Sequence, residues 1–184
     1  MKELSLNILD IAENSLKAKA SLTEILIEEK GNILTLVIRD DGTGMSPEIL
    51  KGVTDPFYTT RTTRKVGMGL PLLKLEAEQT GGTVTVSSVS IEDDSVSHGT
   101  TVTAVFYKDH IDFTPLGDVV STVTTLIQGH PDTDILFVHR TEKGEVTLDT
   151  REIREVLGDE VPLSEYDVIM WIDGSLKEQY EDLR

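Results

Sequence analysis

The chain contains no cysteine, which excludes disulfides, thiolate metal sites, iron–sulfur ligation and a cysteine nucleophile. Basic residues are scarce, with 17 Lys and Arg against 33 Asp and Glu and a formal net charge of −16. Because nucleic-acid binding relies on basic residues that neutralise phosphates, this charge argues against it. The apolar runs, such as residues 135–138 and 168–172, are far too short to span a bilayer. We therefore expect a soluble, cytoplasmic protein without membrane insertion.

The acidic residues are unevenly distributed along the chain. From His110 onward, 17 Asp and Glu stand against 6 Lys and Arg, whereas residues 1–109 hold 16 against 11. This shift in composition predicts a boundary near residue 110. A chain of 184 residues can bury one large core, or one full domain and a small one. We expect a domain of residues 1–110 and a small acidic accessory domain of residues 111–184.

Hydrophobic periodicity predicts an α+β fold. Apolar residues occupy one half of a helical wheel over residues 3–20, which predicts an amphipathic helix. Residues 23–29 and 32–40 are rich in Ile and Leu and flank a Lys-Gly turn, so an antiparallel hairpin is expected. The order helix, two strands, helix, loop, helix, two strands predicts a two-layer α/β sandwich, with a mainly antiparallel or mixed sheet and helices on one face. After residue 110 the pattern predicts a small αββαα unit.

One face of the first helix carries groups that can act on a polyphosphate. Asp10, Asn14 and Lys17 are spaced i, i+4 and i+7 and fall within an arc of roughly 60°. An amide oxygen is a hard ligand for Mg²⁺, an ammonium group balances phosphate charge, and a carboxylate can orient or deprotonate a nucleophile. Glu13 points about 100° away from Asn14 and is set aside as a base. The same spacing is typical of a solvated helix face, and both interpretations stay open.

Three later segments are short and contain glycine. In residues 40–44, Asp-Asp-Gly-Thr-Gly, an aspartate can accept a hydrogen bond from an exocyclic amine, and glycine leaves room for a flat ring. Gly67 and Gly69 precede a helix whose free N–H groups favour anions, with basic residues just upstream. His-Gly-Thr-Thr at residues 98–101 opens a strand. In isolation, each segment is also explained by an ordinary turn, loop or capping residue.

Together these segments resemble the GHKL family of ATP-binding domains, also called histidine-kinase-like ATPases. The resemblance covers residues 4–107 and joins the motifs in the family's order. "DIAENSLK" resembles the N box, "DDGTGM" the Asp-x-Gly-x-Gly box, "DPFYTTRTT" the phenylalanine box and lid, and "VGMGL" with "HGTT" the second and third glycine boxes. The resemblance implies the histidine-kinase-like ATPase fold and binding of ATP with Mg²⁺.

The resemblance also implies roles by position. Asn14 would ligate Mg²⁺, Lys17 would meet the phosphates, Asp40 would accept the adenine amino group, and Thr100 would hold a water beside it. Asp10 takes the place of the general base, where the ATP-hydrolysing branch usually has Glu. Because Asp is one methylene shorter, slow hydrolysis is expected. The expected cofactor-binding residues are Asn14, Lys17, Asp40, Gly42, Gly44, Met45, Phe57, Thr60, Arg61, Arg64, Lys65, Val66, Gly67, Met68, Gly69, Leu70 and Thr100.

Three functions are compatible with these residues. The first is a stand-alone signalling kinase, similar to anti-sigma-factor kinases, that phosphorylates a protein partner docked by residues 111–184. The second is a weak ATPase or a nucleotide-gated binding module. The third is a scaffold protein whose motifs no longer bind ATP. Nine residues precede Asp10 and none is His, so we expect the chain to lack the acceptor hairpin of sensor kinases. The four histidines are expected at turns or on the surface.

Overall fold

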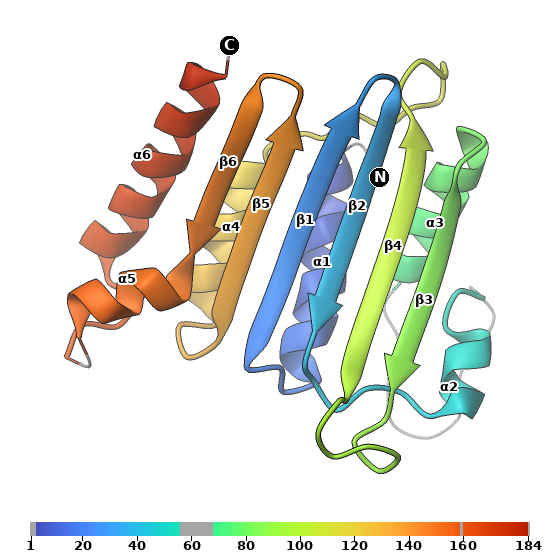
Figure 1. Ribbon diagram of the computed structural model, residues 1–184, viewed down its shortest axis with the longest axis horizontal. Coiled ribbons are helices and arrows are strands. Elements are labelled where there is room, and N and C mark those ends of the chain that lie inside the picture. The colour runs from blue at the N-terminus through green and yellow to red at the C-terminus, as the bar shows by residue number, and fades with distance from the viewer. Residues whose placement is uncertain (1–2, 56–67, 159, 184) are drawn as a thin grey trace.

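The computed structural model describes residues 3–55, 68–158 and 160–183. Its six strands form one sheet in the order β3-β4-β2-β1-β5-β6, and neighbouring strands are antiparallel except for β1 and β5 (Figure 1). Helices α1, α3 and α4 cover one face of this sheet. The predicted α+β sandwich is therefore confirmed. In chain order the elements are α1 (Leu4–Lys17), β1 (Leu22–Lys30), β2 (Ile33–Asp40), α2 (Pro47–Gly52), α3 (Gly69–Gln79), β3 (Thr83–Val89), β4 (Gly99–Tyr107), α4 (Val119–Gly129), β5 (Asp134–Thr141), β6 (Gly144–Asp149), α5 (Thr150–Leu157) and α6 (Tyr166–Asp182).

The first helix is held at the centre of the covered face. β1 and β2 alternate between buried and partly exposed residues, as expected of a sheet with one covered side. Ile25 and Ile38 pair across the two strands and are both buried. The apolar side of α1, including Ile8 and Ile11, is buried in the same core, and α1 contacts both α3 and α4. Polar residues of α1 are thus held at fixed positions above the strand ends.

Residues beyond 110 continue the same sheet. β5 pairs with β1 in parallel, from Leu22 opposite Asp134 to Glu28 opposite Arg140, and β6 extends the sheet by one strand. Buried side chains of α4 and β5 belong to the same hydrophobic core as those of α1. The residues after 110 are therefore more acidic, but their strands belong to the same sheet as the strands before them. That residues 111–184 form a domain of their own stays a prediction. No helix of the described residues is both long and apolar enough to cross a membrane.

A chain of polar contacts connects the last helix to the first strand. Lys108 Nζ lies 2.7 Å from Glu29 Oε2, and His139 Nε2 lies 3.0 Å from Glu29 Oε1. The second ring nitrogen of His139, Nδ1, lies 2.8 Å from the Tyr180 hydroxyl. A neutral imidazole satisfies both contacts by donating to Glu29 and accepting from Tyr180. His139 is buried in β5 with 3% of its surface exposed, so the expectation that every histidine lies at a turn or on the surface is wrong.

The buried His139 is expected to make folding sensitive to mild acid. Burial lowers the pKa of His139, and the Glu29 carboxylate only partly offsets this effect. Below about pH 6.5 the unfolded chain then binds a proton that the folded chain resists, so stability falls as the pH falls. One proton contributes a slope of at most about 1.4 kcal/mol per pH unit. Urea unfolding between pH 7.5 and 5.5 should show this slope, since ordinary Asp and Glu side chains titrate mainly below this range.

The matched variants for this experiment are two single histidine substitutions. His139→Gln should lose the slope because the titrating imidazole is gone. His110→Gln should retain it, since His110 lies in an exposed turn after β4. An equal slope in the native chain and in His139→Gln would contradict the assignment.

Candidate functional site

A cavity of about 190 Å³ is lined by residues at the ends of α1 and β2, at the start of β4, in and just after α2 and in the first turn of α3. Pockets that enclose a whole drug-sized ligand occupy about 300–1,000 Å³, so this cavity has the size of a flat ring. Apolar side chains form most of its wall. The cavity is lined by Ile11, Asn14, Ser15, Lys17, Ala18, Ile38, Asp40, Gly44, Met45, Ile49, Val53, Leu70, Thr100 and Val102.

The structure brings residues from several of the predicted motifs to this one cavity. Seven of the predicted residues line it, namely Asn14, Lys17, Asp40, Gly44, Met45, Leu70 and Thr100. Four others, Asp10, Gly42, Met68 and Gly69, do not contribute to its wall. The remaining predictions, Phe57, Thr60, Arg61, Arg64, Lys65, Val66 and Gly67, lie outside the described residues.

Asp40 provides a carboxylate in the cavity wall. One of its oxygens accepts a hydrogen bond from the Ser15 hydroxyl at 2.7 Å, and the other accepts from the Gly42 backbone N–H at 2.9 Å. A carboxylate has about four lone-pair sites, so both oxygens can still accept from a ligand. Sequence reasoning missed Ser15. Its signal was a hydroxyl within the apolar half of the first helix, because Ser15 follows Ile11 at i+4.

The glycine turn after β2 is held in place by its surroundings. Gly44 has φ +67°, and a Cβ there would lie 1.9 Å from the carbonyl oxygen of Val89. A side chain is therefore excluded by both conformation and space. His98 Nδ1 lies 2.5 Å from the Gly42 carbonyl oxygen, and the N–H of Thr43 donates to the Ala18 carbonyl. These contacts fix the turn between the end of α1 and the loop before β4.

Thr100 is placed beside Asp40 by strand register. The two residues are partners in the antiparallel pairing of β2 and β4. Ser88 accepts a hydrogen bond from the Met45 N–H at 2.8 Å and lies 2.8 Å from the Thr100 hydroxyl. Ser88 was not predicted, because a serine within a β-rich segment carries no signal until β3 is paired with β4. It connects the glycine turn to the strand that carries Thr100.

Asp10 lies against the start of α3. A Cβ on Gly69 would lie 2.2 Å from Asp10 Oδ2, so the carboxylate packs directly on this glycine. Met68, the residue before it, is exposed. Asp10 is one turn from Asn14 on the same helix, and it is therefore directed toward the α3 end of the site and is not part of the cavity wall.

The other charged residues of α1 are divided between two directions. Glu13 Oε1 lies 3.1 Å from His130 Nε2, beyond the end of α4, and Glu13 Oε2 lies 3.9 Å from Lys17 Nζ. Lys17 is exposed, with 66% of its side chain accessible, and can reach a ligand in the cavity. Glu13 is engaged away from the cavity, in the direction that the helical wheel predicted.

Proteins with a related sequence include two sensor proteins and a putative sensor histidine kinase. Sensor protein SrrB of Staphylococcus aureus (strain NCTC 8325 / PS 47) is 33% identical over 93 residues, which are 48% of this chain and 16% of SrrB. Sensor protein KdpD of Clostridium acetobutylicum is 33% identical over 89 residues, 46% of this chain and 10% of KdpD. A putative sensor histidine kinase NtrY-like protein of Rickettsia conorii is 26% identical over 93 residues, 50% of this chain and 15% of that protein. The chain thus matches only a small part of each relative's length.

Two solved structures share the fold over most of the chain. The ATPase domain of MutL from Aquifex aeolicus, complexed with ADP, has a TM-score of 0.56 and 16% identity, and the match covers 85% of this chain and 69% of that chain. The N-terminal domain of a DNA repair protein has a TM-score of 0.54 and 18% identity, covering 86% and 58%. These likenesses show the fold alone. Residues 2–110, more than half of the chain, match the family described as histidine kinase-, DNA gyrase B- and HSP90-like ATPases, and the chain belongs to this family.

Proposed function

We propose that the chain binds Mg-ATP in the cavity beside Asp40 and transfers the γ-phosphoryl group to a residue of a partner protein. Family membership supports ATP binding. The observation that carries the proposal is the convergence of Asn14, Asp40 and Thr100, from three separate segments, on one ring-sized cavity. The sequence relatives, which include sensor kinases, support phosphoryl transfer over other uses of ATP.

The cavity suits an adenine ring. Ile38, Val102 and the other apolar wall residues can contact the faces and edges of a flat base, while Asp40 can accept a hydrogen bond from its amino group. Burial of that ring removes apolar surface from water, and the carboxylate sets its orientation. Thr100, 2.8 Å from Ser88, has a hydroxyl that can hold a water between the base and Asp40.

The phosphates would extend along α1 past Asn14 and Lys17. Mg²⁺ usually keeps several waters and takes one or two protein oxygens together with phosphate oxygens, and the Asn14 amide oxygen in the cavity wall fits this requirement. When bound, Mg²⁺ neutralises charge that develops on the phosphate oxygens. Lys17 balances a further negative charge. One face of α1 would thus arrange the metal shell, the water and the acceptor.

Asp10 would act on the acceptor. The acceptor's oxygen or nitrogen forms a bond to the γ-phosphorus while the bond to the β–γ bridging oxygen breaks and ADP leaves. The acceptor proton passes to the Asp10 carboxylate. Asp10 lies one helical turn from Asn14 and directly against Gly69, and this position supports its contact with the transferred group and not with the base.

An alternative is a slow ATPase or a binding module that nucleotide switches without phosphoryl transfer. The observation that favours it is Asp10 itself. Because Asp is one methylene shorter than Glu, the Asp10 carboxylate can stop short of the acceptor proton of a partner, with room for one water between them. Asp10 would then activate that water for hydrolysis.

Incubation with γ-labelled Mg-ATP distinguishes the three functions, which are the kinase, the ATPase and the nucleotide-dependent switch. Bound nucleotide, free phosphate and labelled protein are measured separately, with an extract of the source cell as the supply of partners. Label on a partner protein supports the kinase. Free phosphate without protein label selects the ATPase, and nucleotide-dependent capture of a partner with neither product selects the switch. An absence of bound nucleotide in calorimetry would overturn all three.

A further inference from the structure

α5, α6 and β6 lie at the end of the sheet opposite β3 (Figure 1). Residues of these three elements line a second concave surface. We define it as the α5–α6 groove. It has a volume of about 740 Å³ and an apolar base that includes Leu136, Leu148 and Ile153. It shares no lining residue with the cavity beside Asp40. No residue of the groove takes part in the proposed chemistry.

The walls of the groove carry apolar side chains that the described chain leaves uncovered. Val156 on α5 is 86% exposed and Trp171 on α6 is 59% exposed. On α6, Ile172 and Leu176 are buried in the core and do not line the groove, while Asp167, Trp171 and Ser175 line it at i, i+4 and i+8. α6 therefore has one stripe for the core and a second for the groove. Adjacent exposed apolar groups of this kind mark interaction surfaces in soluble proteins.

The rim of the groove is acidic on both sides. Glu152 of α5 and Asp167 of α6 line it, and within the described residues neither side-chain carboxylate makes a hydrogen bond or ion pair. Residues 150–184 hold 10 Asp and Glu against 4 Lys and Arg. This field repels acidic ligands and anionic lipid surfaces and attracts basic ones. A partner therefore combines an apolar surface with positive charge at its margins.

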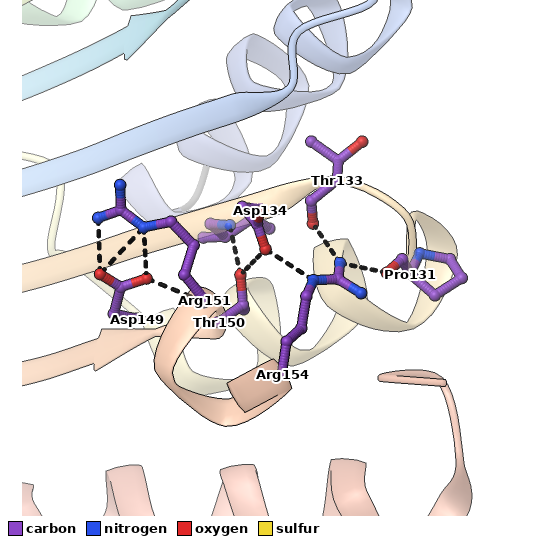
Figure 2. A network of polar contacts seen from close by, with 8 residues as sticks. Pro131, Thr133, Asp134, Asp149, Thr150, Arg151 and Arg154 are labelled. Atoms are coloured by element: carbon purple, nitrogen blue, oxygen red, sulfur yellow. Dashed lines mark hydrogen bonds and ion pairs between the residues drawn. The ribbon is translucent and has the colours of Figure 1, made fainter. Parts of the chain in front are cut away.

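The α5 wall is anchored to the sheet. Thr150 donates to Asp134 Oδ1 at 2.9 Å and accepts from the Ile135 N–H, and Arg154 Nε donates to the same Asp134 oxygen at 2.8 Å (Figure 2). Figure 2 also shows that the Arg151 guanidinium donates a hydrogen bond to the Asp149 carboxylate. A wall fixed before binding loses little conformational freedom when a ligand docks.

The edge of β6 argues for a helix and against an added strand. An open sheet edge is a template for strand addition. At Thr147, however, the Gln179 side-chain amide accepts from the backbone N–H at 2.9 Å and donates to the carbonyl at 3.1 Å. The side chain of α6 thus occupies both hydrogen-bonding groups that a new strand would use there. A ligand would therefore bind through side-chain contacts in the groove and not by adding a strand to β6.

We propose that the α5–α6 groove binds an amphipathic helix of a partner protein, whose apolar side chains contact Trp171 and whose Lys or Arg residues face Glu152 and Asp167. Helix-in-groove recognition uses anchors at i, i+3, i+4 and i+7, which suits a groove with two helical walls. The inference deepens the proposed function by giving the partner's chemistry, but binding in the groove requires no nucleotide.

Trp171 is the chain's single tryptophan, so its fluorescence reports on the groove directly. The probe is a synthetic amphipathic helix of Leu and Lys, roughly 18 residues or five turns long. Added to the full chain without nucleotide, it should shift the emission to shorter wavelength and saturate. A peptide of the same composition in scrambled order, a Leu/Glu counterpart and anionic vesicles should have no such effect. No shift with the Leu/Lys peptide would overturn the proposal.

Substitutions locate the binding by calorimetry. Trp171→Ala should weaken peptide binding by about tenfold or more, as removal of a buried aromatic anchor does. Glu152→Lys with Asp167→Lys should weaken it and reduce its dependence on salt. Ile111→Ala, at an exposed apolar residue elsewhere, and Asp93→Lys are matched controls that should bind normally. Circular dichroism confirms that each variant is folded.

Two further outcomes decide the occupant. Unchanged peptide binding in the Trp171 and charge-reversal variants would overturn the proposal. An emission shift that depends on protein concentration in the absence of peptide would also overturn it, because it would assign the groove to a second copy of the chain. Asp40→Asn should bind the peptide normally. Failure of nucleotide binding and failure of the groove are therefore distinguishable.

Discussion

Replacing Asp40 by Asn is expected to weaken Mg-ATP binding by roughly 10- to 100-fold while the chain stays folded. A hydrogen bond to a charged group contributes about 1.5–3 kcal/mol, and an amide would present either a weaker acceptor or a second donor to the adenine amino group. Ser15 donates to Asp40 Oδ2 and Gly42 to Oδ1, so the amide NH₂ also conflicts with one of these donors. Isothermal titration with Mg-ATP measures the loss.

The neighbouring carboxylate provides the control. Asp41 accepts hydrogen bonds from the Ser21 N–H at 2.7 Å and the Leu22 N–H at 2.9 Å, and it does not line the cavity. Partial burial opposes its ionisation, but these hydrogen bonds lower the pKa of Asp41 overall. Asp41→Asn should therefore cost no more than about 1 kcal/mol of stability at neutral pH and leave ATP affinity unchanged. Equal loss of affinity in both variants would refute the role of Asp40.

Asp10→Asn is expected to reduce phosphoryl transfer or hydrolysis by about 10²- to 10⁴-fold, the range that a general base contributes. ATP affinity should change little, because Asp10 does not line the base cavity. Single-turnover kinetics with saturating Mg-ATP separates the two effects. Glu13→Gln is the matched control on the same helix, since Glu13 contacts His130. Full turnover by Asp10→Asn would exclude it as the base.

Two further substitutions test the position of the Asp10 carboxylate. Gly69→Ala would place a methyl carbon 2.2 Å from Asp10 Oδ2, so the carboxylate must move and turnover should fall with the fold intact. Asp10→Glu restores the acid usual in the family, but its extra methylene meets the same glycine. Faster hydrolysis in Asp10→Glu would show that the length of the Asp10 side chain limits hydrolysis by the native chain. An unaffected Gly69→Ala would show that the contact has no role.

Much of the sheet could be predicted from local patterns, and the long-range pairing could not. The β1–β2 hairpin follows from two Ile-rich segments around Gly31, which has φ +56° in the turn. The parallel pairing of β1 with β5 joins residues more than a hundred positions apart, as with Leu22 and Asp134. Hydrophobic periodicity assigns a strand but gives no partner. The change of charge at residue 110 predicts a boundary there, but it does not indicate that one sheet includes strands from both sides of this position.

The candidate site was predictable where its residues form short motifs. Asn14 and Asp40 each belong to a recognisable segment, and both line the cavity. Ser15 and Ser88 were missed because serine is common and their roles depend on which segments pack together. The contact of Asp10 with Gly69 likewise depends on how α3 packs on α1. Such contacts become visible only when the tertiary structure is known.

The parallel pairing of β1 with β5 has a consequence for anyone who trims or fuses this protein. In the whole chain β1 is an interior strand, and the edge strand on its side of the sheet is β6, where Gln179 covers the backbone of Thr147. Truncation after residue 110 would remove β5 and expose to solvent the backbone hydrogen-bonding groups of residues 22–28. A bare strand with this Ile- and Leu-rich sequence invites self-association. The family segment and the residues after it are therefore best produced as one piece.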